Sequence, residues 1–255
     1  MQKLKVYANL WAAPILLIVL WQALSSAGLL LDVILPSPVK VVKAFIGIIK
    51  NGTLFIDLKT SGRRVLTGYF WGVVVGLSFG MLCGLSKIIE RFFRPIVDVI
   101  RQIPLYAWIP LIILWFGIGE TSKHVIIGQA VFIPVFINTF QGVRGVSSDY
   151  IEVANALEIK RLKLIRKVVF PSALPSIFTG VRLGAGMAWM AVVASEMLGG
   201  LTGLGYGMMI SRDYLHSDRL IALMAVVGLV GFLCDKVIRL IERTSLSWQK
   251  GFEGK

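Results

Sequence analysis

Residues 65–85 read VLTGYFWGVVVGLSFGMLCGL and contain no Asp, Glu, Lys or Arg. An apolar run of about 20 residues is the length that a helix needs to cross the hydrocarbon core of a bilayer. Gly72, Gly76 and Gly80 recur here every four residues, as Gly180 and Gly184 do later, and this spacing favours close packing between membrane helices. The stretch predicts a spanning helix, and its glycines favour packing against another helix of the same subunit over packing at a dimer contact.

Five further apolar stretches extend this pattern along the chain: residues 10–31, 96–118, 125–140, 177–198 and 220–241, of which 125–140 is short. The composition agrees, since 56% of the residues are hydrophobic and only 16% are charged, against about 45–50% and ~25% in soluble domains. The mean hydropathy is +0.78. We predict an all-α polytopic membrane protein with about six transmembrane helices.

The 27 Lys and Arg against 14 Asp and Glu give a net charge of +13. If the N-terminus is cytoplasmic, the inner stretches carry about twice as many Lys and Arg as the outer ones. This bias predicts cytoplasmic N- and C-termini. The basic residues lie between apolar segments and form no patch with interleaved aromatic residues on a polar element, so no nucleic-acid partner is expected.

Leu35-Pro36-Ser37-Pro38 cannot continue a helix and predicts an extended turn. It divides an N-terminal transmembrane helix (1–34) from an outer loop with an interfacial amphipathic helix (35–60). A core of five helices (61–245) follows, with a cytoplasmic loop at 142–175 and a tail at 246–255. Apolar character resumes at residues 29–31, which favours an uncleaved first helix over a signal peptide.

The sequence offers no catalytic or metal site of a recognisable kind. Cys83 and Cys234 both lie in apolar segments, and His124 and His216 have no partner at metal-ligand spacing. Motifs for nucleotide binding, zinc hydrolysis and serine hydrolysis are absent from the sequence. We therefore expect no catalytic residue, no metal and no cofactor bound by this chain.

The loop after the fourth span is too polar to cross a membrane and too regular to be a linker. Asp149 with Glu152 three residues later predicts a capped helix, in which Ile151, Ala154 and Leu157 recur at helical spacing. A second amphipathic helix is expected over 160–169, before Pro171 and Pro175 break the chain.

In this loop the chain resembles the permeases of binding-protein-dependent ABC importers, in the nitrate, sulfonate and taurine group. The residues that carry the resemblance are Glu152-Val153-Ala154 and Val168-Val169-Phe170-Pro171. It continues outside the loop in Leu35-Pro36-Ser37-Pro38, Phe116-Gly117-Ile118-Gly119-Glu120, Asn138-Thr139, Gly180-Val181-Arg182, Ala188-Trp189 and Glu196-Met197-Leu198.

The resemblance implies a type I importer permease fold in the bacterial inner membrane and a non-enzymatic role. It further implies two cytoplasmic ATP-binding subunits, which would hold ATP and Mg, a second permease copy in a homodimer, and an extracytoplasmic substrate-binding protein. The cargo would be a small anion, moved by alternating access. The ATPase-coupling residues would be Asp149, Glu152, Ala154, Leu157, Glu158, Val168 and Pro171.

Glu158 departs from the family pattern, which has Gly at this position. A left-handed turn costs a non-glycine residue about 1–2 kcal/mol, whereas Glu158 and Arg161 could pair on a continuing helix. Either the turn is built differently or the helix continues, and we hypothesise a longer first helix.

Ionisable residues inside a membrane are functional candidates because their burial is costly. By resemblance, the translocation path would include Arg101, Pro104, Trp108, Trp189 and Glu196. Snorkelling to the headgroups is an equal interpretation for Arg101, and the glycine-rich stretch 199–207 fits either a loop or a gate. The alternative function is an ion-coupled secondary carrier, although no inverted repeat or set of midplane carboxylates supports it.

Overall fold

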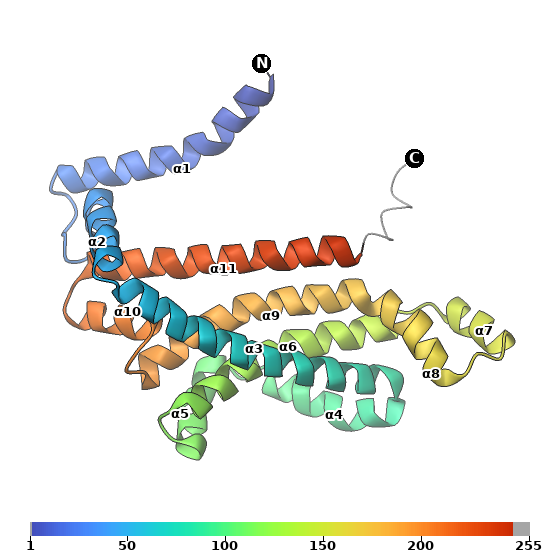
Figure 1. Ribbon diagram of the computed structural model, residues 1–255. Helices are drawn as coiled ribbons and strands as arrows, with labels where there is room; N and C mark the ends of the chain where they lie inside the picture. Colours follow the sequence, from blue (N-terminus) through green and yellow to red (C-terminus); the bar gives the residue numbers. More distant parts are fainter. Residues whose placement is uncertain (1, 247–255) are drawn as a thin grey trace. The chain divides into compact units, whose positions relative to one another are not determined.

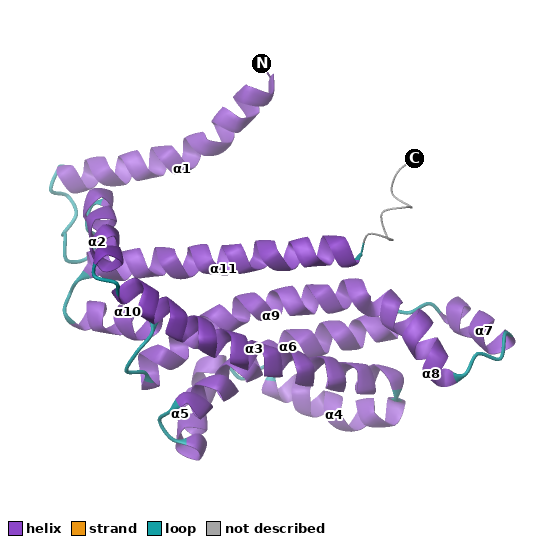
Figure 2. Cartoon of the chain, in the orientation of Figure 1, coloured by secondary structure: helices purple, strands orange, loops and turns teal. Residues whose placement is uncertain are grey.

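The computed structural model describes the backbone of residues 2–246 and the side chains of residues 12–246 apart from that of Asn155. Every regular element in this part of the chain is a helix (Figures 1 and 2). In chain order these are α1 Gln2–Ser26, α2 Pro38–Lys50, α3 Thr53–Leu85, α4 Lys87–Ile100, α5 Leu105–Phe116, α6 Glu120–Arg144, α7 Ser148–Ala156, α8 Arg161–Leu164, the π-helical turn η1 Ile165–Val169, α9 Phe170–Gly199, α10 Leu204–Asp213 and α11 Ser217–Ser245. The predicted tail, 246–255, lies outside the described residues except for Leu246.

Within the described residues, four segments are long and apolar enough to cross a membrane: α3, α6, residues 161–199 and α11. The pair α4 and α5 qualifies as a fifth span if the two are taken together, and Ala12–Ser26 of α1 is a shorter apolar helix. The all-α prediction with about six spans is confirmed. The fourth predicted stretch is longer than expected, because α6 runs for 25 residues.

The third predicted span, 96–118, is a broken pair and not one helix. The axes of α4 and α5 differ by 102°, and the break lies at residues 101–104. Pro104 lacks an amide hydrogen and disfavours the helical conformation of the residue before it, so the first helix ends ahead of the proline. The N-terminal position of Pro104 before α5 is compatible with its extended backbone, at φ −55° and ψ 140°.

The expected break at Pro171 and Pro175 is wrong. The helix continues from Arg161 to Gly199, and the turn Ile165–Val169 just before Pro171 is π-helical. In this turn the amide of Phe170 donates to the carbonyl of Ile165, five residues earlier. The wider turn changes the hydrogen-bond register where a proline cannot donate, so the chain passes through without ending the helix.

Three boundary predictions concern the N-terminal part of the chain. The first helix ends at Ser26 and Gly28 adopts φ +72°, so residues 29–31 lie beyond the helix and not within it as predicted. The extended Pro-Ser-Pro turn is confirmed: Ser37 has ψ 150° and accepts a hydrogen bond from the amide of Lys40, while Pro38 begins α2. The helix predicted after it is confirmed as α2.

The chain divides into two compact units. One contains α1, α2, α10, α3 up to Thr60 and α11 up to Gly228, and the other contains α4 to α9 with the remainder of α3 and α11. In the first unit, the carboxylate of Asp57 accepts a hydrogen bond of 3.2 Å from the amide of Gly203, which has φ +107° just ahead of α10. The glycine-rich stretch therefore ends as the first turn of α10, and the hydrogen bond between Gly203 and Asp57 anchors the start of this helix.

A row of glycines on α3 allows the close contact that organises the second unit. We call Gly68, Gly72, Gly76, Gly80 and Gly84 the glycine row. They face Ile127, Val131, Val135, Thr139 and Val143 of α6, respectively, and a Cβ at any of the five would lie 2.6–2.9 Å from a side-chain carbon of its partner. The predicted packing role of these glycines within the subunit is confirmed.

The order of these contacts gives the helix directions. Each step of four residues along the glycine row is matched by a step of four in the same direction on α6, so α3 and α6 are parallel. By contrast, Gly142 of α6 faces Ser176 of α9 and Gly180 of α9 faces Asn138 of α6, which makes α6 and α9 antiparallel. Because α3 and α6 run the same way, α4 and α5 must together return the chain across the membrane.

Substituting a glycine of the row is expected to have the opposite effect from substituting one outside it. Gly72→Ala brings a methyl group to 2.7 Å from the carbonyl oxygen of Gly128, and such overpacking costs about 1–3 kcal/mol. At Gly62 of the same helix an added Cβ meets nothing within 4 Å, so Gly62→Ala should stabilise the helix by up to about 1 kcal/mol. Reversible unfolding in mixed micelles measures both changes, and destabilisation of equal size would contradict the packing.

Candidate functional site

The loop between α6 and α9 begins with the short helix α7. The hydroxyl of Ser147 accepts a hydrogen bond of 3.3 Å from the amide of Asp149, which identifies Ser147 as the capping residue. The predicted cap at Asp149 is therefore wrong by two residues, because Ser147 supplies the same acceptor at the first residue before the helix. Asp149 instead lies in the first turn, where its charge is favourable to the helix dipole.

Among the described side chains of α7, Ala154 alone is buried, and an exposed apolar stripe lies on another part of the helix surface. Ala154 is only 3% exposed, while Tyr150, Val153 and Leu157 are 60%, 59% and 68% exposed. These three residues follow the spacing i, i+3, i+7 and share one helix face. Glu152 is exposed as well. A stripe of this kind, left uncovered by the chain that carries it, is typical of a surface that binds another protein.

The hypothesis that α7 continues through Glu158 is wrong. The helix ends at Ala156 and Glu158 adopts φ +54°. The amide of Ile159 donates to the carbonyl of Ala154, five residues earlier, which is the hydrogen bond of a Schellman motif with Glu158 in the left-handed position. No ion pair joins Glu158 to Arg161 among the described side chains. Glu158 thus adopts the backbone conformation that glycine adopts most readily in such a turn.

The far end of the loop is attached to the membrane helices by apolar contacts. We call Val143, Val169, Ala173 and Ile177 the base cluster; all four are buried and they pack together. Val143 is also the α6 residue that faces the last glycine of the row. Val168 and Pro171 are half-buried beside this cluster in sequence. The base cluster therefore joins the end of α6, the π-helical turn and the start of α9.

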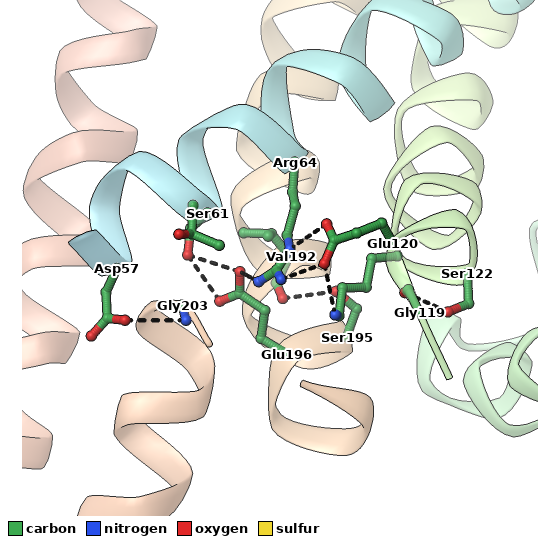
Figure 3. Close-up of polar contacts among 12 residues, drawn as sticks. Asp57, Ser61, Arg64, Gly119, Glu120, Ser122, Val192, Ser195, Glu196 and Gly203 are labelled. Atoms are coloured by element: carbon green, nitrogen blue, oxygen red, sulfur yellow. Dashed lines mark hydrogen bonds and ion pairs between the residues drawn. The ribbon is translucent and has the colours of Figure 1, made fainter. Parts of the chain in front are cut away.

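An ion cluster with a buried centre lies where α3, α6 and α9 approach one another (Figure 3). It consists of Ser61, Arg64, Glu120, Lys123 and Glu196. The guanidinium of Arg64 is 3% exposed and forms ion pairs with Glu196 at 2.8 Å and with Glu120 at 2.5 Å. Ser61 donates to both carboxylate oxygens of Glu196, at 2.8 and 2.9 Å, and Lys123 lies 3.2 Å from Glu120.

This cluster continues the glycine row by one turn. Arg64 is four residues before Gly68, and Lys123 is four residues before Ile127, which Gly68 faces. The two cations thus fall opposite each other, and the carboxylate of Glu120 lies between them. Arg64 could not be singled out from the sequence, because the apolar stretch that predicts the span starts at residue 65, whereas α3 starts at Thr53 and includes Arg64.

The residues predicted for a translocation path fall into two groups. Arg101 and Pro104 are exposed at the break between α4 and α5, where Arg101 pairs with Asp98 at 3.1 Å. Trp108 on α5 is half-buried, and its indole nitrogen has no hydrogen-bond partner among the described residues. Trp189 is 6% exposed and Glu196 is fully buried. In this conformation Trp189 and Glu196 are therefore covered by protein. The charge of Glu196 is paired with Arg64.

Comparison with known proteins identifies the family. The profile of the family described as "Binding-protein-dependent transport system inner membrane component" matches residues 72–245. The chain belongs to this family. It is 39% identical over 241 residues to the putative aliphatic sulfonates transport permease protein SsuC of Bacillus subtilis, covering 94% of this chain and 87% of that protein. It is 35% identical over 235 residues to the nitrate import permease protein NrtB of Synechocystis sp., covering 89% and 84%.

A solved structure shows the same fold. The MetNI methionine ABC transporter in an inward-facing conformation aligns with a TM-score of 0.65 and 18% identity, over 77% of this chain and 97% of that chain. The predicted type I importer permease fold is confirmed. As an ABC permease the chain is a multi-pass inner-membrane protein and a non-catalytic component, with the ATPase in a separate subunit. Within the described residues there is also no cluster of side chains that could hold a metal ion.

Replacing Glu158 by glycine should slow the opening of the turn after α7. The left-handed conformation costs a non-glycine residue about 1 kcal/mol or more, so Glu158→Gly should slow amide exchange at Ile159 by roughly fivefold, read by hydrogen–deuterium exchange. Glu158→Ala, which removes the charge but keeps the strain, is the matched control and should change little. Equal slowing in both variants would point to the charge and contradict the strain.

Neutralising Glu196 should cost far more stability than neutralising Glu120. Glu196→Gln leaves a buried guanidinium partly unpaired, which costs about 3 kcal/mol or more. The side chain of Glu120 is 56% exposed, so water can replace part of its contact in Glu120→Gln, at a cost of about 1 kcal/mol. Unfolding of the purified variants in mixed micelles gives the two values. Losses of similar size would show that the burial of Glu196 does not matter.

Proposed function

We propose that this ABC permease moves a small oxyanion, of the sulfonate, taurine or nitrate kind, that a soluble binding protein delivers. Two copies of the chain would form the transmembrane pathway, and each would dock one ATPase subunit on its cytoplasmic face. The names of the relatives support the cargo class: one is described for aliphatic sulfonates and another for nitrate. Both cargoes carry a negative charge spread over oxygens, which Arg side chains bind well.

The proposal rests on the exposed apolar stripe of α7, a short helix in the loop that joins α6 to α9. Tyr150, Val153 and Leu157 offer apolar area, and Glu152 offers a carboxylate to a basic partner. Ala154 faces inward and allows α7 to lie close to its own chain. We propose that the ATPase binds this stripe and that Asp149 and the Glu158 turn fix the angle of α7.

Movement of α7 would reach the membrane helices through the base cluster. Val168 and Pro171 lie at the start of the segment that continues as α9, and Val143 belongs to both the base cluster and the contact with the glycine row. A displacement of the loop would then shift α6 and α9 together, since packed interiors transmit strain and do not absorb it. ATP binding and release would in this way favour one access state over the other.

The wall of the pathway is proposed to include the break between α4 and α5. Arg101, Pro104 and Trp108 lie at or just after this break, where the chain changes direction within the membrane. Irregular backbone inside a membrane is tolerated where it lines a cavity or is buried in protein. Trp189 and Glu196 would act behind the wall, by holding α9 against its neighbours.

The layout in the membrane follows from the charge distribution. We propose cytoplasmic termini, with residues 1–34 as an additional helix, 35–60 as an outer segment whose helix α2 lies in the interface, and 61–245 as the transport core. The loop 142–175 and the tail 246–255 would be cytoplasmic. A secondary carrier, the alternative function, is not retained, because the family assignment places the energy source in the ATPase.

Charge reversal at Glu152 should release the ATPase. Affinity purification of the chain from mildly solubilised native membranes should bring down an ATPase, and Glu152→Lys should reduce its recovery by about tenfold, since reversing a charge at a docking surface costs one to a few kcal/mol. Asp213→Lys, an equal charge change at an exposed position on α10, is the control and should keep full recovery. If both variants lose the ATPase alike, or neither does, the docking role of α7 fails.

A further inference from the structure

Helix α4 presents three different faces. One face is packed inside the second unit: Ile89, Phe93 and Val97 contact an apolar cluster that includes Cys83 and Phe140. The other two faces are exposed; one carries charged side chains and the other carries apolar side chains. Only the C-terminal end of this helix, at the break, adjoins the proposed wall of the pathway, and its N-terminal two-thirds has no part in that wall.

The charged face of α4 borders a cavity of about 700 Å³. Four cationic side chains line it, Lys87, Arg91 and Arg94 from α4 and Arg144 from the end of α6, together with Glu90 and the ring of Phe140. The guanidinium groups of Arg94 and Arg144 lie 5.1 and 5.9 Å from the centre of that ring. The cavity therefore has an aromatic wall with cations held against it.

The positive charge of this cavity is in excess. Glu90 is its single carboxylate and is engaged by both Arg94, at 3.1 Å, and Arg144. Arg94 is also 3.6 Å from Asp98. Lys87 and Arg91 are exposed and enter none of the ion pairs among the described side chains. Lys87 and Arg91 thus have no acidic partner among the described side chains. An anionic group in the cavity could form charge-assisted hydrogen bonds with both.

An exposed apolar stripe starts beside these cations and runs along the same helix. Ile88, Phe92, Ile96 and Val99 are 81%, 69%, 48% and 64% exposed and fall on one face. From Ile88 to Val99 there are eleven helical steps, which measure about 16 Å at 1.5 Å per residue, close to half of the roughly 30 Å hydrocarbon thickness of a bilayer. The α4 residues that line the cavity, from Lys87 to Pro95, lie beside the first part of the stripe, and the unpaired Lys87 and Arg91 lie near its Ile88 end.

We propose that this surface binds one anionic phospholipid. Its phosphate diester accepts hydrogen bonds from Lys87 and Arg91, with Arg144 behind them, and an acyl chain lies along Ile88, Phe92, Ile96 and Val99. A free phosphate would use the cations but leave the stripe uncovered, and a neutral lipid would cover the stripe but leave the cations unpaired. The lipid uses both, and its length matches the stripe. The site also borders the loop that precedes α7, since Arg144 is the last residue of α6.

Native mass spectrometry of the full chain, purified with its partner subunits, tests the proposal. We expect phosphatidylglycerol to bind more tightly than phosphatidylcholine with the same acyl chains, and dihexanoyl phosphatidylglycerol and inorganic phosphate to bind weakly. The double variant Lys87→Gln, Arg91→Gln should weaken phosphatidylglycerol binding by about tenfold or more. The control, Lys43→Gln with Lys50→Gln, removes two exposed charges from α2 and should have no effect.

Three outcomes would overturn the proposal: equal binding of the charged and neutral lipids, equal weakening by the two double variants, or inorganic phosphate binding as tightly as the long-chain lipid. A photoreactive residue at position 92, activated in native membranes, distinguishes the remaining occupants of the stripe. A phospholipid adduct supports the proposal, whereas a covalent dimer of the chain or a cross-link to another subunit in place of that adduct would assign the face to a protein.

Discussion

The close approach of α3 to α6 is the contact on which the rest of the second unit depends. Lipid is as apolar as a leucine side chain, so burying apolar area cannot by itself hold two helices together in a membrane, and dense packing must do so. Five glycines on one face of α3 allow this packing from Gly68 to Gly84, and they fix the register of α3 against α6. That register brings Arg64 opposite Lys123 and sets Glu120 between them.

From this contact the arrangement of the other helices follows. Parallel α3 and α6 require the segment between them to recross the membrane, which the bent pair α4 and α5 does. Helix α9 returns against α6, and Glu196 on it pairs with Arg64 on α3. Burying either charge alone would be costly, but the ion pair between Arg64 and Glu196 offsets that cost. The pair also holds α9 against α3. The base cluster holds α6 and α9 together where the loop with α7 departs.

Much of the fold could be predicted from the sequence, because span length and glycine spacing are local signals. The loop helices were also predictable, and α2 and α7 both exist. The errors arose where tertiary structure decides. A continuing helix at Glu158 is cheaper locally, yet the chain must turn back toward the base cluster, and the Schellman hydrogen bond closes that turn. Pro171 could not be expected to continue a helix without knowing that a π-helical turn precedes it.

The candidate site residues divide along the same line. Glu152 and Ala154 could be proposed from the sequence because the loop motif is contiguous, whereas Arg64 and Ser61 could not, because their partner, Glu196, is more than 130 residues away in the chain. A single long-range pair leaves no periodic pattern. Its importance follows from burial, since a guanidinium that is 3% exposed needs acidic partners nearby.

We propose that motion of the exposed helix α7 is passed to α9 through the base cluster. Double electron–electron resonance between the two copies proposed for the assembled importer, spin-labelled at Val153 on α7 or at Met190 on α9, tests it most directly; both positions are exposed in the chain. Adding ATP under conditions that block hydrolysis should change the distance at 153 and, together with it, the distance at 190. A change at 153 with no change at 190 would contradict the claim.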